Sequence, residues 1–230
     1  MVNKLKVAVI AALAMTVMAT SAMAATIIDF RNGAAAAGGA ITFDGTNAIG
    51  NDLPIGLVEV FGAPTNNGVF AVTGMLTNSS GMVGDLDFNT TSGSDFITIM
   101  GCIPGLGVGT FLADGTCTAP VALLSGSIDS FNASNQGTPG NEKGAIWMVG
   151  PDTKHADLLS AIGLAPNTPF ELFGFALLTG PLGQTPQKSI STDIRNSEMA
   201  PIPEPATMML LGTGLLAAFR ARRKQQQQLL

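Results

Sequence analysis

The sequence predicts an all-β fold, an antiparallel β-sandwich of jelly-roll type with one short helix. Short apolar or alternating runs are cut by turn signals such as Asp44-Gly45, Asn67-Gly68 and Ser92-Gly93. Many short strands at this spacing are typical of sandwiches and related antiparallel folds. The runs predict strands over Thr26–Phe30, Ala40–Phe43, Leu57–Phe61, Val69–Thr77, Gly84–Asn89, Asp95–Cys102, Val121–Phe131, Ala145–Val149, Phe170–Leu178 and Ser189–Arg195.

One segment departs from the β pattern. Asp152 or Thr153 is placed to cap a short helix, which Gly163 ends. The only histidine, His155, lies near its start, and we expect it to be a solvated surface residue. The apolar face of this helix is expected to contain Leu158, Leu159 and Ile162.

The first 24 residues have the pattern of a secretory signal peptide. Lys4 and Lys6 provide the positive start, and an apolar stretch from Val7 to Val17 follows. Small residues at Ala22 and Ala24 then predict cleavage by signal peptidase before Ala25. The alternative is that the segment is retained as a signal anchor.

The last thirty residues have three parts in a fixed order. Pro203, Glu204 and Pro205 come first, and Pro205 suits the first position of a helix. The following 14 residues, 206–219, carry no charge and would form a helix of roughly 21 Å, short for a hydrocarbon core of roughly 30 Å. A basic cluster that favours the cytoplasmic side stops this transmembrane helix and comprises Arg220, Arg222, Arg223 and Lys224.

This order of Pro-Glu-Pro, short apolar helix and arginine cluster resembles the PEP-CTERM sorting signal of exported bacterial proteins. In that family a membrane protease and transferase, exosortase, recognises the signal, removes it and passes the protein to the cell surface or exopolysaccharide matrix. The resemblance implies processing by exosortase after transient anchoring in the inner membrane. An unprocessed single-span anchor is the alternative. The expected organisation is signal peptide 1–24, exported domain 25–195, linker 196–202, sorting signal 203–224 and extension 225–230.

The exported part is strongly acidic. Between Ala25 and Ile202 there are 5 basic and 15 acidic residues, a formal net charge of 5 − 15 = −10. Such a body repels nucleic acid and anionic membrane surfaces, so we expect no nucleic-acid partner.

The two cysteines, Cys102 and Cys117, both lie in the exported part. In an oxidising compartment they are expected to form one disulfide, which would restrain the unfolded chain by roughly 3 kcal/mol. A metal site would need more ligands than these two cysteines supply, and the only histidine, His155, is distant in sequence.

Enzymatic chemistry is poorly supported by the motifs, and we expect neither an enzyme nor a cofactor. Asp85, Asp87 and Asn89 should share one face of a strand, because side chains alternate with period two. This pattern is expected of an amphipathic surface strand; the alternative is a contact for calcium or a sugar, since hard cations prefer oxygen ligands. A hydrolase using paired carboxylates is the third reading.

Trp147, the only tryptophan, has apolar neighbours on both sides. This pattern predicts a buried core position rather than a sugar-stacking platform. Four methionines are likewise expected to fill the core or its edges: Met75, Met82, Met100 and Met148.

Together these features predict an exported, exosortase-sorted protein with a structural or adhesive role in the exopolysaccharide matrix or biofilm at the cell surface. The alternative is a carbohydrate- or calcium-binding surface module.

Overall fold

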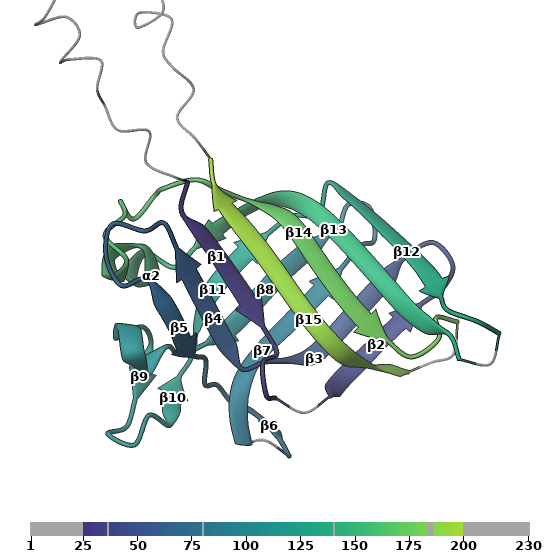
Figure 1. Cartoon of the computed structure of the whole chain (residues 1–230), viewed down its shortest axis with the longest axis horizontal. Coiled ribbons are helices and arrows are strands. Elements are labelled where there is room, and N and C mark those ends of the chain that lie inside the picture. The colour runs from purple at the N-terminus through teal and green to yellow at the C-terminus, as the bar shows by residue number, and fades with distance from the viewer. Residues whose placement is uncertain (1–24, 36, 80, 140, 184–185, 200–230) are drawn as a thin grey trace, which may run out of the picture. The chain divides into compact units, whose positions relative to one another are not determined.

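Eight antiparallel strands hydrogen-bond in a closed ring (Figure 1). The structure is a computed structural model and describes residues 25–199 apart from 36, 80, 140, 184 and 185. Each ring strand pairs with the next, and the last pairs with the first. In ring order the strands are β13 (Lys143–Lys154), β11 (Val121–Gly126), β8 (Phe96–Gly101), β7 (Gly81–Asn89), β3 (Ala48–Ile55), β2 (Gly38–Phe43), β15 (Gln187–Glu198) and β14 (Phe170–Thr179).

Further strands extend this barrel at its sides. β12 (Ser130–Gln136) pairs with β13, and β6 (Leu76–Asn78) pairs with β7. On the other side, β1 (Ile27–Arg31) joins β15 to β4 (Leu57–Phe61), which pairs with β5 (Gly68–Ala71). The remaining elements are a small ribbon of β9 (Thr110–Phe111) and β10 (Cys117–Ala119), the 3-10 helix η1 (Pro104–Leu106) and the α-helix α2 (Ala156–Ala161).

Two long strands close the ring, because each changes partner along its length. The first part of β13 pairs with β12, where Ser130 lies opposite Val149, and its end pairs with β11. Likewise β15 begins beside β2 and continues beside β1, where Ser197 lies opposite Ile27. The first and last strands of the described chain are therefore direct neighbours.

Side chains fill the barrel. Phe88 of β7 and Phe175 of β14 are both buried and meet edge to face with their ring centres 5.5 Å apart. Gly50 of β3 allows this packing, since a Cβ atom there would lie 2.3 Å from the Phe88 ring. Inward positions alternate with outward ones, as in other small barrels.

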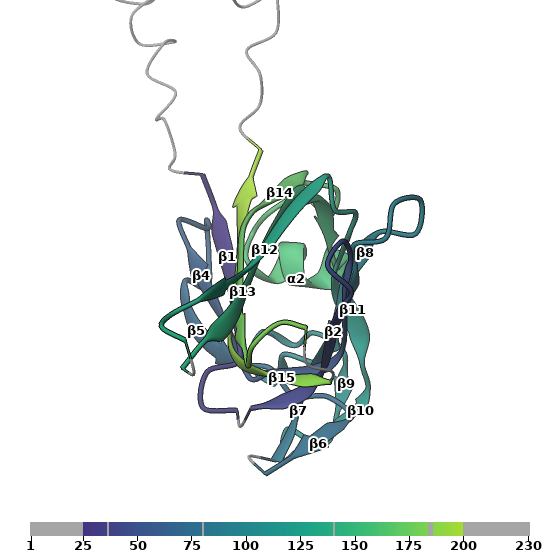
Figure 2. The same ribbon diagram turned by 90° about the vertical axis from the view of Figure 1, so that its right-hand side faces the viewer.

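Helix α2 packs its apolar face inward, as expected. Leu158, Leu159 and Ile162 are buried, and Figure 2 shows α2 between the β1–β4 side and the β8–β11 side of the molecule. The predicted cap is wrong, however: His155 is the N-cap residue, and its Nδ1 accepts the backbone N–H of Asp157 at 3.3 Å. The candidates Asp152 and Thr153 lie in β13, because this strand runs further than its apolar part indicates.

The closed barrel replaces the two-sheet, jelly-roll sandwich that was expected. The antiparallel all-β class is confirmed, as is one short α-helix in the described part of the chain. Periodicity identifies strands but carries no information about the order in which they pair. The expected sandwich and the observed barrel therefore differ in which strands pair. The ring closes because β13 and β15 each pair with three other strands.

Several strand boundaries also differ from those predicted. The run Val69–Thr77 is divided between β5 and β6, and Val121–Phe131 is divided between β11 and β12. β3 was not predicted, because Gly50 and Pro54 interrupt its apolar pattern. β15 continues through Glu198, and Asn196 is buried in it, so residues 196–198 belong to the barrel rather than to a linker.

The compact unit that contains the barrel ends at Met199. Among the described residues, no helix is long and apolar enough to cross a membrane. The predicted signal peptide, the Pro-Glu-Pro motif, the apolar segment 206–219 and the basic cluster lie outside the described residues.

Candidate functional site

The carboxylates singled out on β7 gather a third one from β3. Asp85 and Asp87 share a face of β7 as predicted, while Leu86 and Phe88 between and beyond them are buried on the other face. Asp52 joins them, and one carboxylate oxygen of each of the three residues lies within 4.8 Å of the others.

A bulge in β3 brings Asp52 to this position. The register between β3 and β7 shifts between Gly50 and Leu53, and Asp52 adopts a positive φ of 55°. Its backbone N–H then donates to Oδ1 of Asp87 at 2.9 Å. Asp52 is distant in sequence and lies in a strand that was not predicted, so no sequence signal identified it.

Asn89, the third predicted member, is oriented elsewhere, since its Oδ1 accepts the backbone N–H of Thr91 at 2.8 Å. This hydrogen bond shapes the turn after β7 rather than contributing to the carboxylate cluster. The cluster is therefore Asp52, Asp85 and Asp87.

Burial and mutual repulsion disfavour the ionised form of Asp85 in this cluster. Burial, followed by the nearby charges of Asp87 and Asp52, raises the pKa of Asp85 from 3.8 to about 6. The Oδ1 atom of Asp85 is buried and accepts no hydrogen bond from any residue that the structure describes. Such a group is stabilised by a proton or by a cation that neutralises its neighbours.

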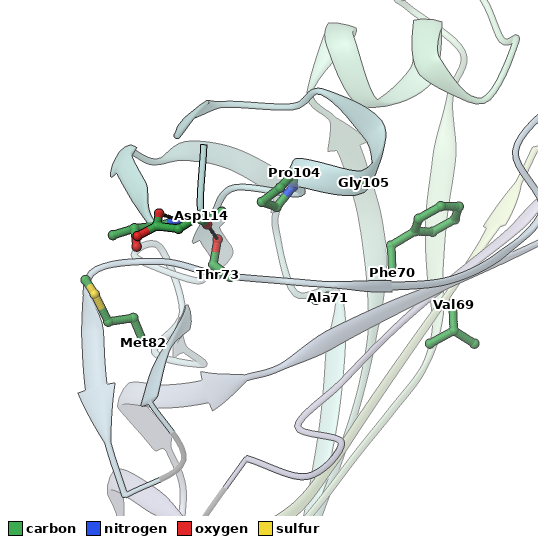
Figure 3. Close-up of a pocket in the computed structure, with 10 residues that line it drawn as sticks. Val69, Phe70, Ala71, Thr73, Met82, Pro104, Gly105 and Asp114 are labelled. Atoms are coloured by element: carbon green, nitrogen blue, oxygen red, sulfur yellow. Dashed lines mark hydrogen bonds between the residues drawn. The ribbon is translucent and has the colours of Figure 1, made fainter. Parts of the chain in front are cut away.

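The predicted disulfide between Cys102 and Cys117 is present, with 2.06 Å between the sulfur atoms. It joins the end of β8 to β10 and encloses η1, with Gly109 packed against the Cys102 sulfur. Beside this loop lies an open hollow of about 570 Å³, which β5 and the turn before β10 line together. Phe70 lies at one end of it, and Thr73 and Asp114 lie together at the other (Figure 3).

A network of charges crosses the outer face of β1, β4 and β15. The Asp29 carboxylate is fully buried and receives hydrogen bonds from Arg31 and, at 3.3 Å, from Arg195. Arg31 also lies 3.0 Å from Glu59. Burial and the adjacent Asp29 raise the pKa of Asp193 at the margin of this network. Two of the five basic residues of the exported body are thus used to neutralise Asp29.

A second charged pair is buried at the end of β13. Asp152 and Lys154 form an ion pair, and both side chains are 0% exposed. The Lys154 Nζ atom also lies 4.9 Å from the centre of the Phe170 ring. Burial lowers the pKa of Lys154 from 10.5 to about 8, and the Asp152 charge opposes that shift.

The prediction that Trp147 is buried is wrong. Ile146 and Met148 point inward, whereas Trp147 between them lies on the outer face of β13 and is 41% exposed. Among the four methionines Met148 is buried and Met100 is half-buried, whereas Met75 and Met82 are 61% and 38% exposed. Apolar residues on both sides of a strand position therefore did not indicate burial here.

Fold and charge together define the exported body as an acidic, filled antiparallel barrel. Immediately after it, residues 201–224 match the family model of the PEP-CTERM protein-sorting motif. This match confirms that the C-terminal stretch is a PEP-CTERM sorting signal and marks the chain as an exosortase substrate. No curated protein and no solved structure matches the chain.

The chain is thus an exported protein that exosortase sorts to the cell surface.

Proposed function

We propose that the barrel is the delivered cargo and that it acts at the cell surface or in the exopolysaccharide matrix as a structural or adhesive component. The observation that supports this role most directly is the position of the sorting signal. It follows the last barrel strand after only a few residues, so a complete, acidic domain of formal charge −10 is what the signal delivers. In this proposal the body displays and binds rather than catalyses.

The processing part of the proposal predicts a defined product. In the native host, intact mass should reveal a chain that begins at Ala25 and ends near Pro203–Pro205. In a strain without exosortase activity the protein should keep its C-terminus and remain in the inner membrane. A full-length C-terminus in both strains would mean that the tail is a plain anchor.

If the role is structural, loss of the protein from the cell surface should weaken the cohesion of the matrix. A strain without this protein should form less cohesive biofilm, and the intact chain should restore it. A chain in which Pro203, Glu204 and Pro205 are replaced by alanine is the matched control, because its barrel is unchanged. Equal restoration by this variant would exclude a role that requires sorting.

The carboxylate cluster favours calcium binding as a second candidate function. Asp52, Asp85 and Asp87 come from two strands, and their oxygens are close enough to share one hard cation. Millimolar CaCl₂ should raise the melting temperature of the exported protein, with no effect on Asp85→Asn/Asp87→Asn. Asp129→Asn, on an exposed loop, is the matched control for the loss of charge. An identical calcium shift in all three proteins would exclude this cluster as the site.

A further inference from the structure

The strand β12 has a free edge. It pairs with β13 over all seven of its residues, from Ser130 to Gln136, and with no other strand among the described residues. A free edge presents backbone N–H and C=O groups that can pair with another strand. Native proteins usually protect such edges with charged residues, proline or short strand length.

β12 has none of these protections. Its sequence, Ser-Phe-Asn-Ala-Ser-Asn-Gln, contains no charge, proline or glycine. Other strands that pair along one edge only are shorter: β5 has four residues and β6 has three. In addition, η1 lies against β5, where a Cβ atom on Gly105 would be 3.2 Å from the Phe70 ring. β12 is therefore the longest free edge in the described part of the chain.

Exposed apolar side chains lie next to this edge on the outer face of the sheet. Trp147 and Val149 of β13 are 41% and 42% exposed, and they lie opposite Asn132 and Ser130 of β12. Leu178 of β14, 39% exposed, pairs with Ala145 two residues from Trp147. An uncharged edge beside an apolar patch is unusual in a body with a formal charge of −10.

We propose that β12 is a self-association surface, where a second copy of this chain pairs its own β12 antiparallel to the first. A second copy fits because the strand is self-complementary about Ala133. Antiparallel pairing about that residue places Ser130 opposite Gln136 and Asn132 opposite Ser134 on the outer face. These pairs bring hydroxyl and amide groups together and no like charges, whereas most other surfaces of two copies repel each other.

The pairing joins the two outer sheets into one surface and brings the Trp147 patches to either side of the junction. The contact is isologous, because each copy contributes the same strand, so it closes at two copies. This inference does not depend on exosortase sorting or on calcium, since it rests only on the free edge and its neighbouring side chains.

The test is the association state of the exported protein, measured by sedimentation at several concentrations. We expect a monomer–dimer equilibrium. Asn132→Lys/Ser134→Lys should raise the dissociation constant by at least about tenfold, because lysines then face each other across the junction. Both positions lie on the outer face, so the melting temperature of this variant should match that of the original protein.

The matched control is Val69→Lys/Ala71→Lys, which puts the same charges on exposed positions of β5 at the other edge of the sheet. It should leave the dimer intact. Fluorescence of Trp147, the only tryptophan, should shift to shorter wavelength as the dimer forms. A monomer at all concentrations, or a dimer that only the β5 variant disrupts, would overturn the proposal.

Discussion

Asp85 links the carboxylate cluster to the pH dependence of stability. Its pKa is raised from 3.8 to about 6, so between these values the folded protein binds more protons than the unfolded chain. The free energy of unfolding should therefore fall as pH rises from about 4 to about 6. Asp85→Asn should remove this component and stabilise the protein at pH 7 by on the order of 1 kcal/mol after solvent screening.

Urea denaturation between pH 4 and pH 7, in the presence of a chelator, measures this effect. Asp129→Asn is the control, since it removes one exposed carboxylate outside the cluster. If the Asp85→Asn profile has the same slope as the original protein, Asp85 does not carry the raised pKa.

The buried pair of Asp152 and Lys154 makes a second prediction at the same scale. Asp152→Asn should destabilise the barrel by about 3 to 5 kcal/mol, because the buried Lys154 amino group would lose the opposite charge that offsets its burial. Adding Lys154→Met should recover most of the loss, since the methionine fills a similar volume without a charge. A double variant no more stable than Asp152→Asn would show that the carboxylate acts independently of Lys154.

At the residue scale, local alternation was sufficient to predict that Asp85 and Asp87 share a face. It could not identify Asp52, whose position depends on a bulge in another strand. It also misplaced Trp147, because an apolar run indicates burial only when both faces of the strand are covered. The pairing of Cys102 with Cys117 was predictable because the chain offers no other cysteine.

At the scale of elements, helix α2 depends on a cap that the sequence pattern did not reveal. Histidine is not among the strongly preferred N-cap residues, yet His155 Nδ1 accepts the Asp157 N–H. His155→Ala should reduce the free energy of unfolding by about 1 kcal/mol, while His155→Asn should retain most of it. Urea denaturation of both variants separates the two roles: equal losses would mean that ring packing, not capping, matters.

Element prediction succeeded where the apolar pattern was continuous and failed where it was not. β1, β4 and β8 agree closely with their predicted ranges, since each is a short, mainly apolar run next to turn residues. β12 is polar because its outer face is solvated, so its residues were assigned only partly to a strand. Strand partners, in contrast, are long-range properties that no local pattern contains.

At the scale of the whole molecule, the barrel can close only when its last strand is present. β15 pairs with β14, β2 and β1, and the first strand finds its partner at the end of the body, where Glu198 N–H donates to Thr26 O at 2.8 Å. The entire body must therefore be exported before folding is complete.

This closure predicts a sharp difference between two truncations. A chain that ends after Leu182 lacks β15, so β14, β2 and β1 each lose one of their two neighbours. This chain should show no cooperative thermal unfolding and should be degraded rapidly by protease. A chain that ends after Met199 keeps every described strand and should unfold at the same temperature as the exported protein. Cooperative unfolding of the shorter chain would contradict the closing role of β15, and folding could then begin during export. If the shorter chain shows no cooperative unfolding, the sorting signal, which follows β15 directly in the sequence, reaches exosortase only on a body that has all the strands needed to close the barrel.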